Sequence, residues 1–346
     1  MIKFITLNNI EKHYRKLNIL KKYFSTVYLG VIVENKREDL LVLGSKYNFT
    51  ELELIRLNKQ LNSPISNIPV YMRPDKDVID EIKTYLASGE SKVIVLNLRQ
   101  APSNALIKFL THIELQGIKY YTFDHFMEKI LHKCFVPDND LDHLSFLEEV
   151  SHFSKFQYLQ KRIFDITAIL TLFIFTWPVL LFAAYRVKKE SPGPVFFRQS
   201  RIGLNGKPFM CAKFRSMHVN SHFDPYTQKN DTRIFPFGNF MRKTRIDELP
   251  QMWNVLVGEM HFIGPRAEWD ILVQGYEKAI PYYSERHIVC PGITGWAQVH
   301  YPYGQNEEDT RQKLMYDLYY IKHWNLIVEF QTVWKTIEVV LGRKGL

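Results

Sequence analysis

The stretch Arg242-Lys-Thr-Arg-Ile-Asp-Glu-Leu-Pro-Gln-Met-Trp-Asn-Val-Leu-Val-Gly258 places two adjacent acids, Asp247 and Glu248, among arginines. Pro250 fits only in the first turn of a helix, because no intrahelical amide donor is needed there. The sequence therefore predicts that both carboxylates lie at a helix N-terminus, where the macrodipole favours anions and a phosphate can bind. The helix itself is predicted by apolar residues at i, i+3, i+4 and i+7 and by a terminal glycine: Leu249, Met252, Trp253, Leu256 and Gly258.

The composition of the 346-residue chain sets limits on its function. The length is enough for two domains, and 46% hydrophobic residues can build a large core. The net charge of +9 favours an anionic partner, such as a phosphorylated substrate or an anionic membrane surface, although a solvated basic surface also explains it. No nucleic-acid-binding motif accompanies this charge, so we expect no nucleic acid among the partners. The three cysteines lie far apart without metal-ligand spacing, which argues against a disulfide framework or a zinc site.

Residues 1–136 have the pattern of a soluble α/β domain. A helix is predicted to open at Pro102-Ser103-Asn104 and to end at Gly117. Because strands precede and follow this helix, we expect them to be parallel. No Gly-x-Gly-x-x-Gly follows any strand, so a structural or regulatory role is favoured over dinucleotide binding. Residues 137–160 are polar and predict a linker. The predicted strands cover residues 27–33, 40–43, 92–98 and 118–123.

The segment 166–185 carries no charged side chain and is long enough to cross a bilayer, which takes about 20 residues. Pro178 lies in its middle and is expected to break or kink the helix. Basic residues flank both ends, with Lys161 and Arg162 before it and 186–189 after it, so both ends are expected on the same side of the membrane. These features favour a re-entrant helix over 161–186; a simple spanning helix and a buried core helix are the alternatives.

The remaining residues, 190–346, are rich in aromatic and basic side chains. They predict a turn followed by a strand over 191–201, a tight turn at 203–207 and a second strand at 209–215. Near the end, Tyr316, Tyr320, Trp324, Ile327 and Val328 form an apolar face that suits either an interfacial amphipathic helix or a helix packed on the core.

Several motifs over about 160–346 together resemble one known family, the bacterial sugar transferases, which are monotopic polyprenyl-phosphate phosphoglycosyl transferases. The N-terminal part resembles, more weakly, the Rossmann-like soluble domain of larger members, whose transmembrane bundle we do not see ahead of it. The resemblance implies an α/β fold: a Rossmann-like domain over 1–136, then a mostly α catalytic domain over 161–346 with a Pro-broken re-entrant membrane helix and interfacial amphipathic helices. The motifs are Lys161-Arg-Ile-Phe-Asp165, Gly193-Pro-Val-Phe-Phe-Arg-Gln199, Lys213-Phe-Arg-Ser-Met217, Asp247-Glu-Leu-Pro-Gln251, Gly264-Pro-Arg266 and Pro291-Gly-Ile-Thr-Gly-Trp-Ala-Gln-Val299.

The resemblance also implies a reaction: transfer of a sugar-1-phosphate from a UDP-sugar to polyprenyl (undecaprenyl) phosphate with release of UMP. Asp247 is the expected nucleophile and Mg²⁺ ligand, and Glu248 the expected acid/base or polar partner. An isolated acid pair of this kind is usually a solvated helix start, and each arginine alone is as often a surface charge; the surrounding motifs favour the site. The expected substrate-binding residues are Arg242, Arg266, Lys213, Arg215, Arg286, Gln298 and Asp317.

The expected membrane residues are Lys161, Arg162, Asp165, Trp177 and Pro178, with Asp165 pairing with an arginine to anchor the helix. The expected location is the cytoplasmic face of the bacterial inner membrane, with membrane lipid as a partner and a homodimer as one expected assembly. Such an enzyme would catalyse the first membrane step of exopolysaccharide or O-antigen assembly. The sequence does not identify the sugar, the pathway or the role of the N-terminal domain.

Overall fold

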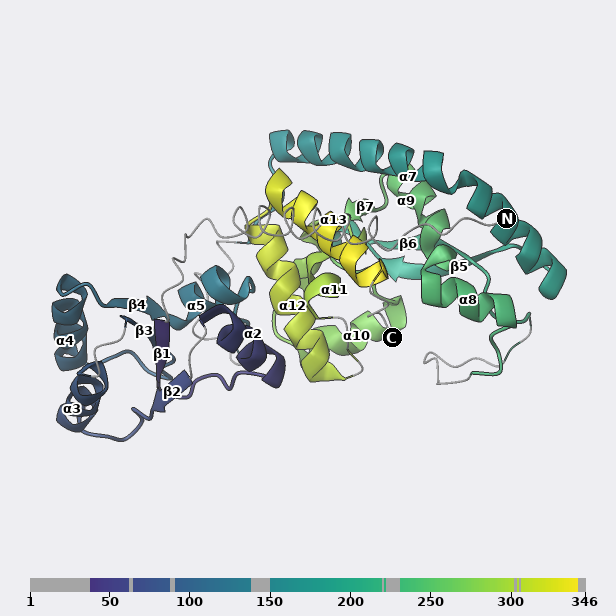
Figure 1. The fold of residues 1–346 in the computed structure, drawn as a ribbon. Coiled ribbons are helices and arrows are strands. Elements are labelled where there is room, and N and C mark those ends of the chain that lie inside the picture. The colour runs from purple at the N-terminus through teal and green to yellow at the C-terminus, as the bar shows by residue number, and fades with distance from the viewer. Residues whose placement is uncertain are drawn as a thin grey trace, which may run out of the picture. The chain divides into compact units, whose positions relative to one another are not determined.

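The computed structural model describes residues 38–61, 65–87, 91–137, 150–219, 221, 231–301, 304 and 306–341. The chain divides into two compact units, unit 1 up to Phe126 and unit 2 from Met127 onward (Figure 1). The predicted strand at 27–33 and residues 138–149 of the predicted linker lie outside the described residues.

Unit 1 contains a parallel sheet, as the sequence predicts. Among the described residues it has the strand order β2-β1-β3-β4, and every neighbouring pair is parallel. The strands are β1 (Glu38–Leu43), β2 (Ile65–Ile68), β3 (Ser91–Leu96) and β4 (Lys119–Thr122). The helices are α2 (Glu51–Leu61), α3 (Asp75–Leu86), α4 (Asn104–Leu115) and α5 (Phe123–Phe126).

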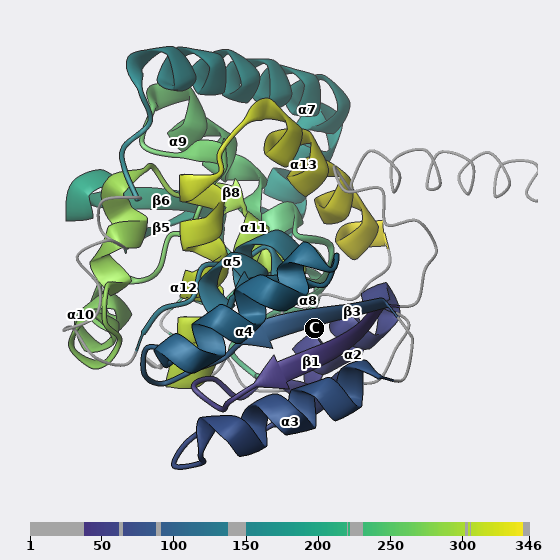
Figure 2. The ribbon, with the colours of Figure 1, turned by 90° about the vertical axis from the view of Figure 1, so that its left-hand side faces the viewer.

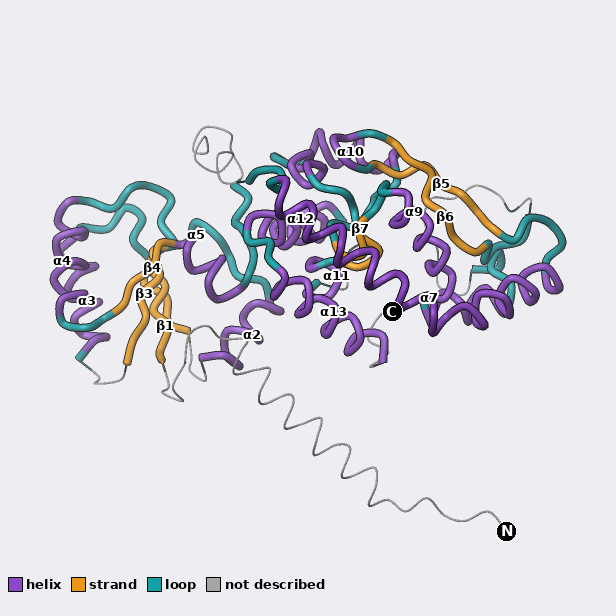
Figure 3. Tube along the Cα trace, turned by 90° about the horizontal axis from the view of Figure 1, so that it is seen from above, coloured by secondary structure: helices purple, strands orange, loops and turns teal. Residues whose placement is uncertain are grey.

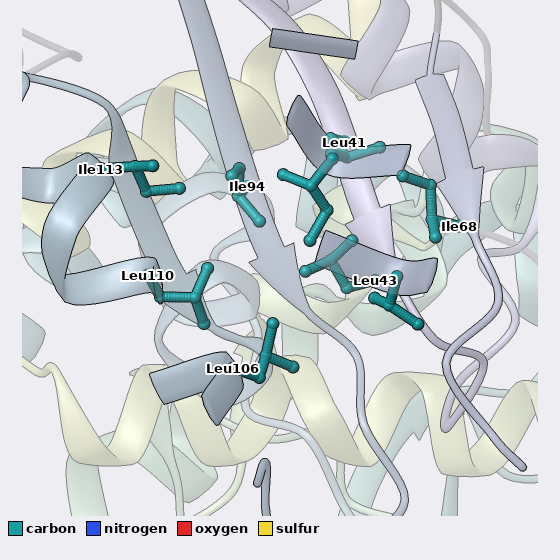
Figure 4. Packing of buried hydrophobic residues seen from close by; sticks show 9 residues of the cluster. Leu41, Leu43, Ile68, Ile94, Leu106, Leu110 and Ile113 are labelled. Carbon is teal, nitrogen blue, oxygen red and sulfur yellow. The ribbon is translucent and has the colours of Figure 1, made fainter. Parts of the chain in front are cut away.

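The core of unit 1 lies between the sheet and two helices. Leu41, Leu43 and Ile94 pack in one buried cluster with Leu106 and Leu110 of α4, and residues of α3 join the same cluster (Figures 2 and 4). These strand residues share one face because side chains alternate along a strand. Helix α4 begins as predicted, since the Ser103 hydroxyl accepts a hydrogen bond from the Leu106 amide at 3.1 Å.

Unit 2 is mostly helical, as the sequence predicts. Its first helices are η1 (Met127–Leu131), α7 (Lys155–Glu190), η3 (Leu204–Gly206), α8 (Pro236–Thr244), η4 (Ile246–Gln251) and α9 (Met252–Val257). They are followed by α10 (Asp270–Ala279), η5 (Tyr283–Ile288), α11 (Trp296–His300), α12 (Glu307–Lys322) and α13 (Leu326–Leu341). The strands are β5 (Phe196–Ile202), β6 (Pro208–Phe214), β7 (His261–Ile263) and β8 (Gly292–Thr294).

Two short strand pairs support the helices of unit 2. β5 and β6 are the two strands predicted on either side of the tight turn, and they lie side by side as an antiparallel hairpin (Figure 3). β7 and β8 pair in parallel, so the motif that begins at Pro291 contributes a short strand. This pairing requires glycine, because a Cβ at Gly292 would lie 2.1 Å from the backbone nitrogen of Gly264.

Helix α7 contains the whole apolar segment and begins at Lys155, inside the predicted linker. A capping box between Ser154 and Gln157 starts it. It continues through Pro178 as one helix that bends along its course (Figure 1), so a re-entrant geometry stays a prediction. The Thr176 hydroxyl, two residues before Pro178, donates to the Leu172 carbonyl at 2.7 Å.

The apolar faces of α7 and α12 differ in exposure. Only 11% of the 18-residue apolar window in α7 is buried, which disfavours the core-helix alternative for this segment. By contrast Tyr316, Tyr320 and Trp324 are buried, so this stretch packs on the core of unit 2 and does not form an interfacial face. On α13, Ile327 is 60% exposed, which leaves part of the predicted apolar face open.

Candidate active site

The acid pair lies on η4, a 3₁₀ turn that continues into α9. Arg245 precedes η4 in the left-handed conformation at φ 59°, and Gly258 ends α9 at φ 90°. The predicted helix start and stop are therefore confirmed, with a tighter first turn around Pro250 than the sequence indicated. η4 packs against β6, the strand that carries Lys213.

Glu248 is the paired member of the two acids. Its Oε1 lies 3.1 Å from Lys213 Nζ, 3.8 Å from Arg266 Nη2 and 3.9 Å from Arg245 Nη1. Burial opposes ionisation of Glu248, but these cations outweigh it and lower the pKa of the carboxyl to about 2. Glu248 is thus ionised at neutral pH and cannot donate a proton there.

Asp247 is the unpaired member. It is 8% exposed, and its Oδ1 is buried without a hydrogen-bond partner among the described residues. The sequence predicts that the helix start holds Asp247 ionised; instead burial, followed by the neighbouring Glu248, raises the pKa of Asp247 to about 6. At neutral pH the carboxylate is mostly ionised yet poorly stabilised, a state that suits a nucleophile.

Three of the predicted phosphate-binding cations lie around this pair. Lys213 and Arg266 contact Glu248, and Arg242 is close enough to lower the pKa of Asp247. The Nε of Arg242 donates to the Ser216 hydroxyl at 3.0 Å. Arg245, which was not among the predicted site residues, belongs to the same set of cations, and its position two residues before Asp247 is a signal for it in the sequence.

Arg215 is arranged differently from the other predicted clamps. Its guanidinium is buried and donates to the Ser191 hydroxyl at 2.5 Å, the Ser191 carbonyl and the Pro194 carbonyl at 2.6 Å. These contacts hold the turn before β5. Arg215 lies two positions after Lys213, so a continued strand would place both on one face, but β6 ends at Phe214 and the alternation does not extend to Arg215.

Arg286, Gln298 and Asp317 line a separate cavity of about 450 Å³, which Arg266 also lines. Arg286 Nη2 donates to Asp317 Oδ2 at 2.7 Å and to the Arg266 carbonyl at 3.0 Å. Burial raises the pKa of Asp317 to about 6, although Arg286 acts in the opposite direction. The Arg286–Asp317 pair therefore fixes the backbone of Arg266. Two charged residues of the cavity, Glu268 and Lys313, were missed because neither belongs to a motif.

The predicted membrane residues Lys161 and Asp165 belong to a buried cluster at the base of α7. We define this α7-base cluster as Lys161, Asp165, His261 and Glu329. Lys161 Nζ lies 3.0 Å from Asp165 Oδ1 and 2.9 Å from Glu329 Oε2, and Asp165 Oδ2 lies 2.6 Å from His261 Nδ1. The partners of Asp165 are thus a lysine and a histidine in place of the expected arginine.

Arg162 connects α7 to the helix that follows the acid pair. Its guanidinium donates to the carbonyls of Val255 and Leu256, both at 2.5 Å, in the last turn of α9. A cation is favoured there because the helix C-terminus carries partial negative charge. Arg162 is therefore a protein contact of the active-site segment, whereas Trp177, 50% exposed on α7, lies on its open apolar face.

The chemistry of the acid pair suits Mg²⁺. Among the described residues no group of three or more His, Cys, Asp or Glu could hold a metal ion. Mg²⁺ is commonly bound by one or two carboxylates together with substrate phosphates, and the unpartnered Oδ1 of Asp247 offers one such ligand. Asp247, with Glu248 beside it, would hold the ion.

Comparison with known proteins identifies the family to which the chain belongs. Residues 156–343, more than half of the chain, match the family model described as bacterial sugar transferase. The chain belongs to the bacterial sugar transferase family. The acid pair, its cations and all of α7 except its first residue, Lys155, lie inside the matched region.

Named relatives carry related descriptions. The chain is 45% identical over 187 residues to the UDP-N-acetylgalactosamine-undecaprenyl-phosphate N-acetylgalactosaminephosphotransferase of Aeromonas hydrophila, which covers 54% of this chain and 44% of the relative. It is 45% identical over 191 residues to the UDP-glucose:undecaprenyl-phosphate glucose-1-phosphate transferase of Xanthomonas campestris pv. campestris, covering 54% and 39%. The exopolysaccharide production protein PSS of Rhizobium leguminosarum bv. phaseoli is 38% identical over 191 residues, covering 53% and 96%. The chain thus spans less than half the length of the first two relatives.

Proposed function

We propose that this protein transfers a sugar-1-phosphate from a UDP-sugar to polyprenyl phosphate through a covalent aspartyl intermediate. The observation that carries the proposal is Asp247, a buried carboxylate with an unpartnered oxygen, placed among Lys213, Arg242 and Arg266. The family and the names of its relatives support the same reaction class.

The reaction has two displacement steps at one phosphorus atom. A carboxylate oxygen of Asp247 attacks the phosphorus that bears the sugar, and the bond to the bridging oxygen breaks, so UMP leaves with that oxygen and its electron pair. A phosphate oxygen of the polyprenyl phosphate then attacks the same phosphorus. This attack displaces the Asp247 carboxylate and forms the polyprenyl diphosphate sugar.

The surrounding charges make these steps possible. Lys213, Arg242 and Arg266 neutralise phosphate oxygens as the anionic carboxylate approaches them. Glu248 has a pKa of about 2, so it stays ionised and does not act as a proton donor. It holds Lys213 and Arg266 in place, and its negative charge raises the pKa of Asp247. Mg²⁺ bound at Asp247 would supply further neutralisation of the diphosphate.

The exposed apolar face of α7 supports a place for this reaction at the membrane. We assign the enzyme to the cytoplasmic face of the bacterial inner membrane, with α7 inserted as a re-entrant helix and the chain acting as a homodimer. The product would start a surface polysaccharide such as an exopolysaccharide or O-antigen. A cysteine-accessibility scan at both ends of α7 tests the topology, and labelling from opposite sides of the membrane would refute a re-entrant helix.

The chemistry is tested by combining a UMP-release assay with intact-protein mass measurement. With UDP-sugars alone, the wild-type protein should gain the mass of one sugar phosphate; adding undecaprenyl phosphate should remove it. Asp247→Asn should lose the adduct and reduce turnover by at least about 10³-fold.

The matched control is Asp270→Asn, which changes a carboxylate that accepts from the Ile271 amide at the start of α10. It should keep both signals. Substantial turnover by Asp247→Asn would sink the nucleophile assignment, and sugar-nucleotide binding without any UMP release would indicate a binding protein.

A further inference from the structure

The cavity beside Arg266 is lined by further charged and polar residues that have no role in the proposed displacement steps. At about 450 Å³ it lies within the size range of small-molecule pockets, roughly 300–1,000 Å³. It is lined by Arg266, Glu268, Leu272, Tyr276, Arg286, Ala297, Gln298, Gly304, Thr310, Lys313 and Asp317. The inference below rests on the proposed function, since it concerns the donor substrate of the same site.

Some of the charged groups of the cavity already have protein partners. Arg286 is bonded to Asp317 through two nitrogens and to the Tyr283 hydroxyl at 2.7 Å. Arg266 lies between the acid pair and the cavity, with Nη2 3.8 Å from Glu248 and Nε 4.0 Å from Glu268. Arg266 is therefore placed to contact a phosphate group of a ligand that extends from the acid pair into the cavity.

Three other lining groups keep spare hydrogen-bonding capacity. The Glu268 side chain, 20% exposed, has no hydrogen bond within the described part of the chain, and its contact with Arg266 Nε is at 4.0 Å. The Lys313 ammonium group likewise forms no hydrogen bond or ion pair with the described residues, and Glu268 and Asp317 act on it only through their charge. The Oε1 of Gln298 has no partner among them either.

A carboxylate, an ammonium group and an amide with unused capacity suit a ligand rich in hydroxyl groups. Hydroxyls donate to a carboxylate and accept from an ammonium group, and a sugar ring offers several of them. A pyrimidine base has a single ring N–H donor, so it can satisfy only one of the two acceptors, the Glu268 carboxylate or the Gln298 Oε1. Buried or half-buried polar groups that lack protein partners are commonly completed by a ligand.

We propose that this cavity holds the sugar ring of the nucleotide-sugar donor and that Glu268 and Lys313 select the sugar through its hydroxyl groups. Arg266 holds the phosphate attached to that ring, and Arg286 with Asp317 keeps Arg266 in position. Glu268 and Lys313 then determine which UDP-sugar reaches Asp247, and they take no part in the displacement steps.

The test uses Glu268→Gln and Lys313→Met in the full chain, with Glu307→Gln and Lys278→Met as exposed controls on α12 and α10. UMP release is measured with UDP-glucose, UDP-galactose, UDP-N-acetylglucosamine and UDP-N-acetylgalactosamine. At least one cavity variant should change the ratio of kcat/KM between the preferred sugar and its C4 epimer by at least about tenfold. Inhibition by UMP, which lacks the sugar, should stay unchanged, and both controls should keep the wild-type ratio.

Two results would overturn the proposal. Equal losses for all four sugars with unchanged ratios would mean that the two residues do not read the sugar. Weakened UMP inhibition would mean that the cavity holds the nucleoside.

A binding arm separates this proposal from the reaction itself. In the Asp247→Asn background, calorimetric titration with UDP-glucose, UDP-galactose and UMP measures sugar selection without turnover. Absence of UMP release by the wild type would count against the proposed function, whereas unchanged sugar preference in the binding arm would count against the cavity assignment.

Discussion

The α7-base cluster and the acid pair on η4 both bury carboxylates beside cations, but they satisfy those carboxylates differently. In the α7-base cluster, Lys161 is 0% exposed and lies between Asp165 and Glu329. The other Asp165 oxygen contacts His261, and the other Glu329 oxygen accepts from Tyr320 and Trp324. The Phe262 amide donates to the same Asp165 oxygen that Lys161 contacts. On η4, Glu248 contacts the cations, and Asp247 keeps an oxygen that has no hydrogen-bond partner in the described part of the chain.

This difference in hydrogen bonding indicates a structural role for the α7-base cluster and a chemical role for Asp247. A buried charge with complete hydrogen bonding fixes its neighbours, and here it ties α7 to β7 and α13. A buried polar atom without a partner destabilises the fold and persists in native proteins mainly where a ligand or a reaction uses it. The same residue types thus give an anchor in one place and a candidate nucleophile in the other.

The largest effect is expected from breaking the α7-base cluster. Lys161→Met leaves two acids, Asp165 and Glu329, buried without their shared cation, so the free energy of unfolding should fall by about 3–5 kcal/mol. Thermal unfolding in detergent measures it. The control is Lys189→Met, which removes a lysine near the other end of α7, and a loss below about 1 kcal/mol at Lys161 would contradict the anchoring role.

A smaller effect on stability but a large one on turnover is expected from Glu248→Gln. Lys213 and Arg266 lose the carboxylate that holds them, and kcat should fall by roughly 10²-fold if they neutralise the transferred phosphate. Steady-state UMP release measures it, with Glu259→Gln on the loop after α9 as the control. Unchanged kcat would show that Glu248 is dispensable for arranging the cations.

The pH dependence of the first half-reaction sharpens the assignment of Asp247. Because protonation removes the nucleophile, adduct formation should fall about tenfold for each pH unit below the pKa of about 6. Glu248→Gln removes a like charge that raises this pKa, so its acid limb should move to lower pH. Rapid-quench mass measurement between pH 4.5 and 8 records both profiles, and an acid limb that does not move would argue against this coupling.

The smallest expected effect is a gain in the free energy of unfolding, opposite in sign to the loss expected when the α7-base cluster is broken. Asp247 has a folded-state pKa above its ordinary value of 3.8, so the fold binds the proton more tightly than the unfolded chain does. Its destabilising contribution therefore grows as pH rises from about 4 to about 6 and is fully present at pH 7. Asp247→Asn should raise the free energy of unfolding at pH 7 by about 1 kcal/mol and by less at pH 4.5. Destabilisation at pH 7 would contradict the assignment of Asp247 as an unsatisfied group.

Local patterns predicted the elements whose causes are local. The helix after Ser103, the β5–β6 hairpin and the helical segment ended by Gly258 follow from caps, turn residues and periodicity. The expected Rossmann-like detail beyond a parallel sheet and the re-entrant break at Pro178 stay predictions. The predicted phosphate contact of Arg215 depended on motif membership alone, and its hydrogen bonds to Ser191 and Pro194 could not be seen from spacing.

The sequence by itself determined the apolar helix, the acid pair at a helical start and the basic residues near it, because spacing and residue type set these properties within a few turns of chain. Only the tertiary structure decided how the charges are shared. Lys213 meets Glu248 across 35 positions and Lys161 meets Glu329 across 168. Burial and partnership in space set the pKa of a carboxyl group, so only the folded chain distinguishes the satisfied Glu248 from the unsatisfied Asp247 beside it.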